Sequence, residues 1–110
     1  MKKVVRPWGN FKEFAKNKKC TVKIIELEPR QELSLQLHNK RDELWYFLDE
    51  AVVQLGNKKI RVKEGSIIKI PKKKAHRIIS SNKKARVLEI SFGNFSEGDE
   101  IRLEDKYKRK

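Results

Sequence analysis

The sequence has 110 residues, a length at which one hydrophobic core can form but not two. Its 28 Lys and Arg residues outnumber 15 Asp and Glu, and the resulting formal net charge of +13 attracts polyanions or small anionic ligands. The single cysteine, Cys20, excludes an internal disulfide and a thiolate metal cluster, and no stretch is apolar for long enough to span a membrane.

The composition also indicates where the protein works. The basic N-terminus MKKVVRPWGN is not followed by an apolar run, so we expect no targeting segment, a cytoplasmic location and no membrane contact. Charged residues make up 39% of the chain, and a surface rich in Lys and Glu is also typical of hyperthermophilic proteins. A thermophilic source is therefore one explanation of the charge that needs no partner.

Strand patterns dominate the chain in sequence order. β-branched, aromatic and alternating apolar residues predict strands at 21–28, 32–38, 43–48, 51–56, 58–63, 65–71, 75–80 and 85–92. The residues GNKK, from Gly56 to Lys59, predict a hairpin turn between the fourth and fifth of these strands. Short strands at such regular spacing indicate an all-β sandwich or barrel.

The two ends of the chain carry weaker patterns. Residues 9–19 are expected to form one helical turn or a short hairpin, and residues 97–110 are highly charged, with a mobile end. No repeat or linker appears, so we expect one domain that covers 1–110. It divides into an N-terminal arm (1–20), a barrel (21–95) and a charged tail (96–110).

A candidate metal site emerges from the spacing of four polar residues. Gln36 and His38 are two positions apart and so share one face of a strand, Glu43 opens the next strand, and His76 begins a later one. Imidazole, amide and carboxylate ligands suit Zn, Fe, Mn, Ni or Co, and three or four of them leave a coordination position open. The alternative is that Gln36 and His38 form the wet face of a half-buried strand and that His76 is a surface histidine.

Two segments resemble the paired motifs of the cupin family. QLHNKRDE resembles the first, with Gln36 in the place of its first histidine, and GSIIKIPKKKAH resembles the second, from Gly65 through Pro71 to His76. The resemblance implies a double-stranded β-helix, a small jelly-roll barrel of two sheets. It also implies that Gln36, His38, Glu43 and His76 bind one divalent metal ion, with Zn first and Mn, Fe, Co or Ni as alternatives.

A narrower resemblance covers nearly the whole chain. RPWGNF, the two cupin motifs and EGDEIRLEDKY are similar to the type II mannose-6-phosphate isomerase family, whose cupin domain often follows a guanylyltransferase domain. No Gly-rich phosphate loop precedes the motifs here, so we expect no guanylyltransferase activity. The chain departs from the family at Asn39, Lys40 and Leu44, where histidines are usual, and at Lys73, where glycine is usual.

The family resemblance implies an aldose–ketose isomerase that interconverts mannose 6-phosphate and fructose 6-phosphate through a cis-enediol. Arg102 is the first candidate to bind the sugar phosphate, and Arg77 and Arg6 are weaker ones. A base must also lie within hydrogen-bond reach of the proton it takes. The candidates are Lys40, provided that burial lowers its pKa, and Glu43, provided that it dissociates from the metal. The other candidates are the aromatic residues of strand 43–48, because Trp45 and Phe47 share a face with Glu43 and either wall the pocket or fill the core.

Two rival functions remain open. We also expect the chain to form a homodimer, whichever function it has. The first rival is a metal-binding cupin with another activity or none, because the fold does not fix the function. The second is a nucleic-acid-binding module that uses the basic runs at 16–19, 72–74, 83–84 and 106–110. Those runs lie mostly at turns and lack interleaved aromatic residues, which disfavours nucleic-acid binding.

Overall fold

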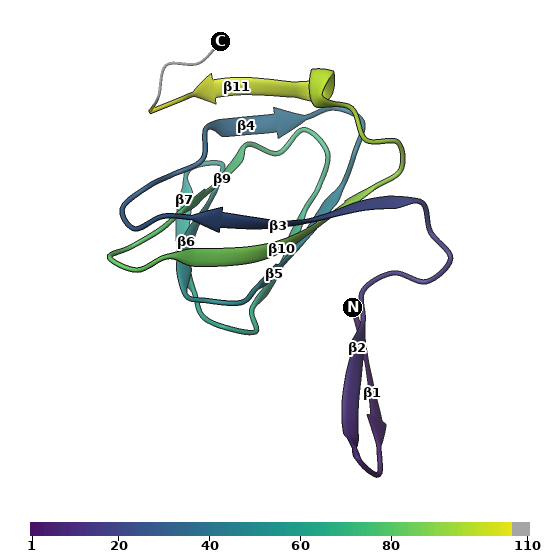
Figure 1. Ribbon diagram of the computed structural model, residues 1–110. Coiled ribbons are helices and arrows are strands. Elements are labelled where there is room, and N and C mark those ends of the chain that lie inside the picture. Colours follow the sequence, from purple (N-terminus) through teal and green to yellow (C-terminus); the bar gives the residue numbers. More distant parts are fainter. Residues whose placement is uncertain (107–110) are drawn as a thin grey trace.

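The computed structural model describes residues 1–106, and these form a barrel of two facing β-sheets with a separate hairpin (Figure 1). The four-stranded sheet has the order β3-β10-β5-β8, with bounds Cys20–Leu27, Ala85–Phe92, Glu43–Phe47 and Ile67–Ile70. The five-stranded sheet has the order β11-β4-β9-β6-β7, with bounds Glu100–Glu104, Leu35–His38, His76–Ile79, Ala51–Leu55 and Lys58–Val62. The predicted all-β, cupin-type double-stranded β-helix is confirmed.

Alternation along the strands places the core between the two sheets. In β5 and β10, Trp45, Phe47 and Val87 point inward, and the register pairs Phe47 with Val87 across the strands. Val53 and Ile78 approach them from the opposite sheet, and all five side chains are fully buried. Burial of each such side chain contributes about 1.5–3 kcal/mol, so this layer holds the sheets in fixed relative positions.

The predicted hairpin turn is confirmed at Gly56. Strands β6 and β7 pair from Ala51 with Val62 to Leu55 with Lys58. Gly56 lies between them with a φ of 59°, a left-handed conformation that residues with a Cβ rarely adopt. The turn therefore fixes the register of the two strands at one edge of the larger sheet.

The two ends of the chain are more regular than the sequence indicates. The expectation of a helical turn or short hairpin at 9–19 is corrected, because the hairpin begins earlier and joins β1 (Lys2–Arg6) to β2 (Gly9–Glu13). In the charged segment after residue 96, a 3-10 turn, η1 (Glu97–Asp99), leads into β11, which pairs with β4. The expected mobile end of the tail lies outside the described residues. Among residues 1–106, the structure contains no helix with the length and apolarity needed to cross a bilayer.

Candidate metal centre

Three strands from both sheets bring His38, Glu43 and His76 together inside the barrel. His38 ends β4, Glu43 begins β5 in the opposite sheet, and His76 begins β9 beside β4. Their exposed fractions are only 2%, 3% and 1%. One potential ligand atom from each residue lies within 4.8 Å of the others, so a single ion could contact all three. Both histidines of the chain are thus part of one buried cluster.

The Glu43 carboxylate stands between the two imidazoles. Its Oε2 is 3.4 Å from His38 Nε2, and its Oε1 is 3.7 Å from His76 Nε2. Trp45 Nε1 donates a hydrogen bond to Oε1 at 3.3 Å, and the hydroxyl of Ser91 donates one to Oε2 at 3.3 Å. These donors hold the carboxylate so that it faces both rings.

Hydrogen bonds at the ring edges determine which imidazole nitrogens are free to bind a metal. His76 Nδ1 is 2.7 Å from the Lys74 carbonyl oxygen and therefore donates its proton there, which leaves a lone pair on Nε2. That Nε2 is buried and has no hydrogen-bond partner. A hydrogen bond from one ring nitrogen to a carbonyl is the usual arrangement of a metal-binding histidine. The donor set therefore fits a divalent ion.

Burial keeps both histidines neutral. The pKa of His38 is lowered to about 4, chiefly by desolvation; the charge of Glu43 opposes this shift, and those of Arg41 and His76 add to it. Desolvation likewise lowers the pKa of His76, against its hydrogen bond to Lys74 and the charge of Glu43. Neutral imidazole is the form that binds metals, so near neutral pH neither ring carries the second proton that would block metal binding.

Arg41 is a buried cation beside the cluster. Its Nε donates to Glu43 Oε2 at 2.9 Å, and an Nη donates to His38 Nε2 at 3.2 Å. The other Nη donates to the Ser96 carbonyl at 3.2 Å, and the guanidinium carbon lies 4.3 Å from the centre of the Phe95 ring. Arg41 therefore lies within reach of any anionic group bound next to the three ligands.

A second carboxylate, Glu89, lies inside the barrel next to this cluster. The register of β10 places it between Trp45 on β5 and Lys23 on β3, so all three side chains share the inner face. Burial and the negative charge of Glu43 raise the pKa of Glu89 to about 7, and Lys23 opposes the shift. Lys23 Nζ also lies 3.9 Å from the centre of the Phe95 ring. The inner face of the smaller sheet is therefore polar at this end.

Strand β11 adds two charged residues beside the cluster, Glu100, which is partly buried, and Arg102, which is exposed. Glu100 pairs with His38, and Arg102 pairs with Gln36, so these side chains lie on the inner face of the larger sheet. Arg102 Nε donates to Glu100 at 2.8 Å. With its amide nitrogen turned toward Glu100, Gln36 donates to both carboxylate oxygens, at 2.7 and 3.0 Å.

The predicted ligands fall into two groups in the structure. His38, Glu43 and His76 form the close cluster, while Gln36 pairs with His76 across β4 and β9 on the same face. The amide of Gln36 contacts Glu100, and its role as a fourth ligand stays a prediction. Of the predicted phosphate-binding residues, Arg102 lies next to this group.

The other predicted site residues lie at varying distances from the cluster. Arg77 is buried in ion pairs with Glu32 and Glu104, and Arg6 lies on the hairpin, which projects away from the barrel (Figure 1). Lys40 is exposed on the turn after His38, where its backbone N–H donates to Asp99. Their predicted roles stay predictions.

The two predicted wall residues are core residues. Trp45 and Phe47 are fully buried, and their rings pack edge to face at 6.2 Å between centroids. Trp45 also reaches the cluster, because its ring packs at 5.3 Å against His76 and its indole N–H contacts Glu43. Phe47 lies one inward position further along β5, within the apolar cluster between the sheets.

Sequence patterns alone missed Arg41, Glu89 and Glu100. Arg41 stands inside the first motif, between His38 and Glu43, but a turn residue there looks exposed. Glu89 carried a usable signal, because alternation in ARVLEISF puts it on the same face as Val87, a core residue. Glu100 carried no such signal, because the sequence predicts a charged tail, and not a strand, for residues 96–110.

Comparisons with known proteins identify the family. The family model described as "Mannose-6-phosphate isomerase C-terminal" matches residues 1–105. The chain belongs to this family. The match covers both motifs and β11, so the family resemblance inferred from the motifs is confirmed.

Relatives agree with this assignment, and a solved structure shares the fold. The chain is 32% identical to the xanthan biosynthesis protein XanB of Xanthomonas campestris pv. campestris (strain B100), over 98% of this chain and 24% of the relative. It is 35% identical to mannose-1-phosphate guanylyltransferase 2 of Escherichia coli O157:H7, over 97% of this chain and 23% of that protein. It therefore spans about a quarter of the length of these curated relatives. A double-stranded β-helix protein of Klebsiella pneumoniae has the same fold, with a TM-score of 0.70, 19% identity and coverage of 84% and 81%.

The relatives correct the predicted function. They are described as guanylyltransferases and as xanthan or alginate biosynthesis proteins, and guanylyl transfer is a different reaction from aldose–ketose isomerisation. The prediction that this chain interconverts mannose 6-phosphate and fructose 6-phosphate is therefore wrong as it stands. The physical reason is that the motifs specify a barrel and a set of ligands, and the same barrel supports many reactions. The family and its relatives are enzymes of sugar metabolism.

Proposed function

We propose that this chain is a divalent-metal-binding cupin domain that binds a phosphorylated sugar in polysaccharide biosynthesis. The observation that carries the metal part is the buried cluster of His38, Glu43 and His76, with the unpartnered Nε2 of His76 beside Glu43. Two neutral imidazoles and one carboxylate match the mixed nitrogen and oxygen sites of Zn and neighbouring transition metals. Bound there, the ion would supply Lewis-acid polarisation of a ligand oxygen.

The ligand part is supported by the charges that surround the cluster. Arg41 touches two of the three candidate ligands, Lys23 stacks on Phe95 from the neighbouring strand, and Arg102 lies opposite Gln36. The guanidinium group of arginine forms hydrogen bonds with phosphate oxygens in a planar, two-point geometry. The names of the relatives place them in the biosynthesis of xanthan and alginate and in chemistry on mannose 1-phosphate.

Metal analysis with matched variants tests the proposal. Purified protein should carry close to one divalent ion per chain, and calorimetric titration with Zn²⁺ should give a single site. We expect His76→Ala and Glu43→Gln each to weaken binding at least tenfold, because loss of a ligand should cost no less than loss of a supporting contact around it. Gln36→Ala should do the same if Gln36 is a fourth ligand.

The control is an exposed carboxylate on the same barrel. Glu26→Gln, on the outer face of β3, should leave the affinity for Zn²⁺ unchanged. Circular dichroism should show that each variant keeps its β-sheet spectrum, so that weak binding cannot be confused with unfolding. Equal Zn²⁺ affinity in wild type, His76→Ala and Glu26→Gln would sink the proposal.

A further inference from the structure

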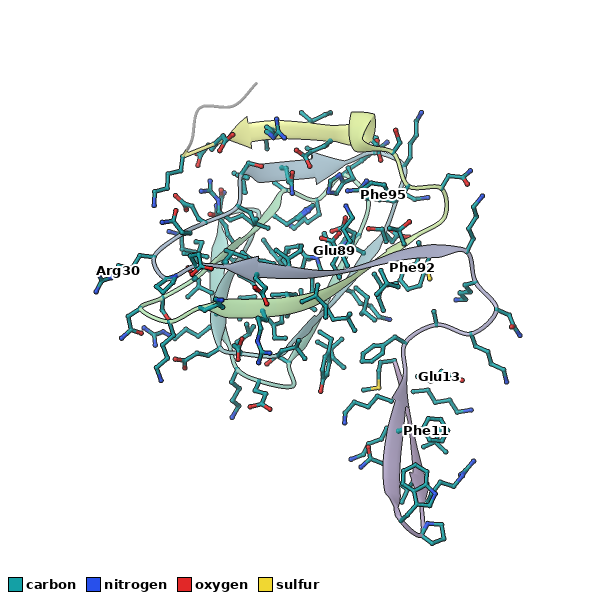
Figure 2. The ribbon with its side chains drawn as sticks, in the orientation of Figure 1. Phe11, Glu13, Arg30, Glu89, Phe92 and Phe95 are labelled. Carbon is teal, nitrogen blue, oxygen red and sulfur yellow. The ribbon has the colours of Figure 1, made fainter. Side chains whose placement is uncertain are left out.

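The segment that joins β10 to β11 contacts the middle of the first motif. Phe95, the third residue after β10, packs its ring against Arg41, with 4.3 Å between the guanidinium carbon and the ring centre. The carbonyl of Ser96 accepts a hydrogen bond from Arg41 at 3.2 Å. Figure 2 shows Phe95 at the end of the barrel where Phe92 lies, far from Arg30 at the opposite end. The segment therefore lies against the same end of the barrel as the candidate metal ligands.

Asp99 connects this segment to the turn after β4, which comprises residues 39–42. Its Oδ1 accepts a hydrogen bond from the backbone N–H of Asn39 at 3.1 Å, and its Oδ2 accepts one from the N–H of Lys40 at 3.0 Å. Its own backbone N–H donates to the Ser96 carbonyl at 3.1 Å, the same carbonyl that accepts from Arg41. Hydrogen bonds to an ionised carboxylate are about twice as strong as those between neutral groups, so both oxygens hold the turn in place.

The two N–H groups that Asp99 holds lie between a candidate metal ligand and a buried cation. Asn39 directly follows His38, and Lys40 directly precedes Arg41. Because peptide groups are planar, fixing two of them in a row restricts the directions in which the flanking side chains leave the backbone. Those two side chains meet, with an Nη of Arg41 3.2 Å from His38 Nε2. A carboxylate that is bonded to the backbone thus acts on both side chains.

Other contacts hold the ends of the same turn but not its middle. The Lys73 N–H donates to the His38 carbonyl at 2.6 Å, and the Lys72 N–H donates to the Asp42 carboxylate at 2.9 Å. The residues between these ends that Asp99 contacts are exposed. Without Asp99 their N–H groups would bond to water, which imposes no fixed geometry on the backbone.

We propose that Asp99 is a positioning residue of the candidate metal centre. From the segment between β10 and β11, its carboxylate holds the turn after β4 so that His38 and Arg41 keep the placement that metal and anion binding require. This inference rests on the proposed function, because it concerns how the same site is kept in order. Asp99 contributes through the backbone and is not itself a ligand of the metal or of the anion.

A purely structural role for Asp99 is the alternative, and Asp49 offers a matched control. Asp49 lies in the turn between β5 and β6, beyond the end of β5 that is opposite Glu43. Its carboxylate accepts a hydrogen bond from the backbone N–H of Arg86 at 3.0 Å and two more from the guanidinium group of that residue. Removal of either carboxylate costs the barrel a turn contact, but only Asp99 acts on residues next to the candidate ligands.

The Zn²⁺ affinity of paired variants tests the proposal. In calorimetric titration of the full chain, Asp99→Ala should bind Zn²⁺ about tenfold more weakly than wild type, at the lower end of the range for residues that support a metal ligand. Asp49→Ala should bind as tightly as wild type, although both variants should unfold at a lower temperature. The amide hydrogens of residues 39 and 40 should exchange faster in Asp99→Ala and not in Asp49→Ala.

Asparagine separates the hydrogen bonds of Asp99 from its charge. Asp99→Asn removes the negative charge but keeps one acceptor oxygen, so it should lose less Zn²⁺ affinity than Asp99→Ala. Equal losses in the two variants would assign the effect to charge and overturn the proposal. If Asp99→Ala does not fold, Asp99→Asn is compared with Asp49→Asn, and equal Zn²⁺ affinity in that pair would also overturn it.

The outcomes also distinguish this inference from the proposed function. Failure of the wild type to bind Zn²⁺ would contradict the proposed function and this inference together. Tight binding by wild type, weak binding by His76→Ala and equal affinity in Asp99→Ala and Asp49→Ala would leave the metal site standing and contradict only the role of Asp99.

Discussion

At the scale of single residues, the barrel interior combines groups whose protonation is set by burial. The pKa of His38 is lowered to about 4 and that of His76 is lowered too, while the pKa of Glu89 is raised to about 7. Desolvation is the largest cause of all three shifts, because burial disfavours the charged form of each group. Near neutral pH, both imidazoles are therefore uncharged, which is the form that binds a metal ion.

The raised pKa of Glu89 makes a pH-dependent contribution to stability. The folded state holds a proton on Glu89 that the unfolded state releases near pH 4.5, so this contribution is present below pH 4.5 and is lost as pH rises through about 7. The histidines have the opposite sign, because their lowered pKa values cost stability only as pH falls below 6.5. Wild type combines both effects.

Glu89→Gln separates the two contributions, since it removes the pH dependence due to Glu89 and leaves that due to the histidines. Relative to wild type, the free energy of unfolding of the variant should rise by on the order of 3 kcal/mol between pH 4.5 and pH 8. Urea unfolding of both proteins at a series of pH values measures this difference, and the histidine contribution cancels in it. Parallel pH profiles for wild type and Glu89→Gln would contradict the assignment.

At the scale of elements, sequence patterns gave the eight central strands and the cupin fold, but not the two ends. Alternation and turn residues are local signals, and they predict strands such as 85–92 to the residue. β11 carries alternating charges instead of a buried apolar stripe, because Glu100 and Arg102 form an ion pair with each other and Arg102 stays exposed. Only tertiary contacts with β4 make it a strand. Arg41 is likewise buried because of tertiary contacts, since its hydrogen bonds to Glu43 and Ser96 form only in the folded barrel.

The turn between β8 and β9 is an element whose sequence departs from its family. Lys73 stands where the family usually has glycine, and its φ is 65°. The left-handed conformation is costly for a residue with a Cβ, by about 1–2 kcal/mol. The turn is nevertheless held in place, because the Lys73 N–H donates to the His38 carbonyl at 2.6 Å and so links the two motifs.

Lys73→Gly should therefore stabilise the barrel. Glycine relieves the strain but increases the entropy of the unfolded chain, so the net gain should be about 0.5–1 kcal/mol. Lys72→Gly, at the preceding residue, has no positive φ to relieve and should cost about 0.5–1 kcal/mol. Thermal unfolding of both variants against wild type checks the difference in sign, and a loss of stability in both would contradict the argument.

At the scale of the whole molecule, charge repulsion works against a compact barrel. The net charge of +13 is spread over a chain of 110 residues, with basic runs at the turns 72–74 and 83–84. Exposed ion pairs, such as Arg86 with Asp49 and Lys84 with Glu28, offset little of it, because water and salt screen exposed charges. The thermophilic interpretation of this composition stays a prediction.

The dependence of stability on salt should reveal whether the exposed ion pairs or the repulsion among the excess positive charges has the larger effect. Salt weakens the exposed ion pairs and also weakens the repulsion among the excess positive charges, and with 28 cationic against 15 acidic side chains the second effect should dominate. The midpoint of thermal unfolding should therefore rise by several degrees between about 0.01 M and 0.15 M NaCl. The Trp8→Ser variant, which changes an exposed residue of the hairpin, should show a similar rise, since the repulsion lies within the barrel. A midpoint that falls with salt in both proteins would mean that the exposed ion pairs, and not the net charge, govern the stability of this barrel.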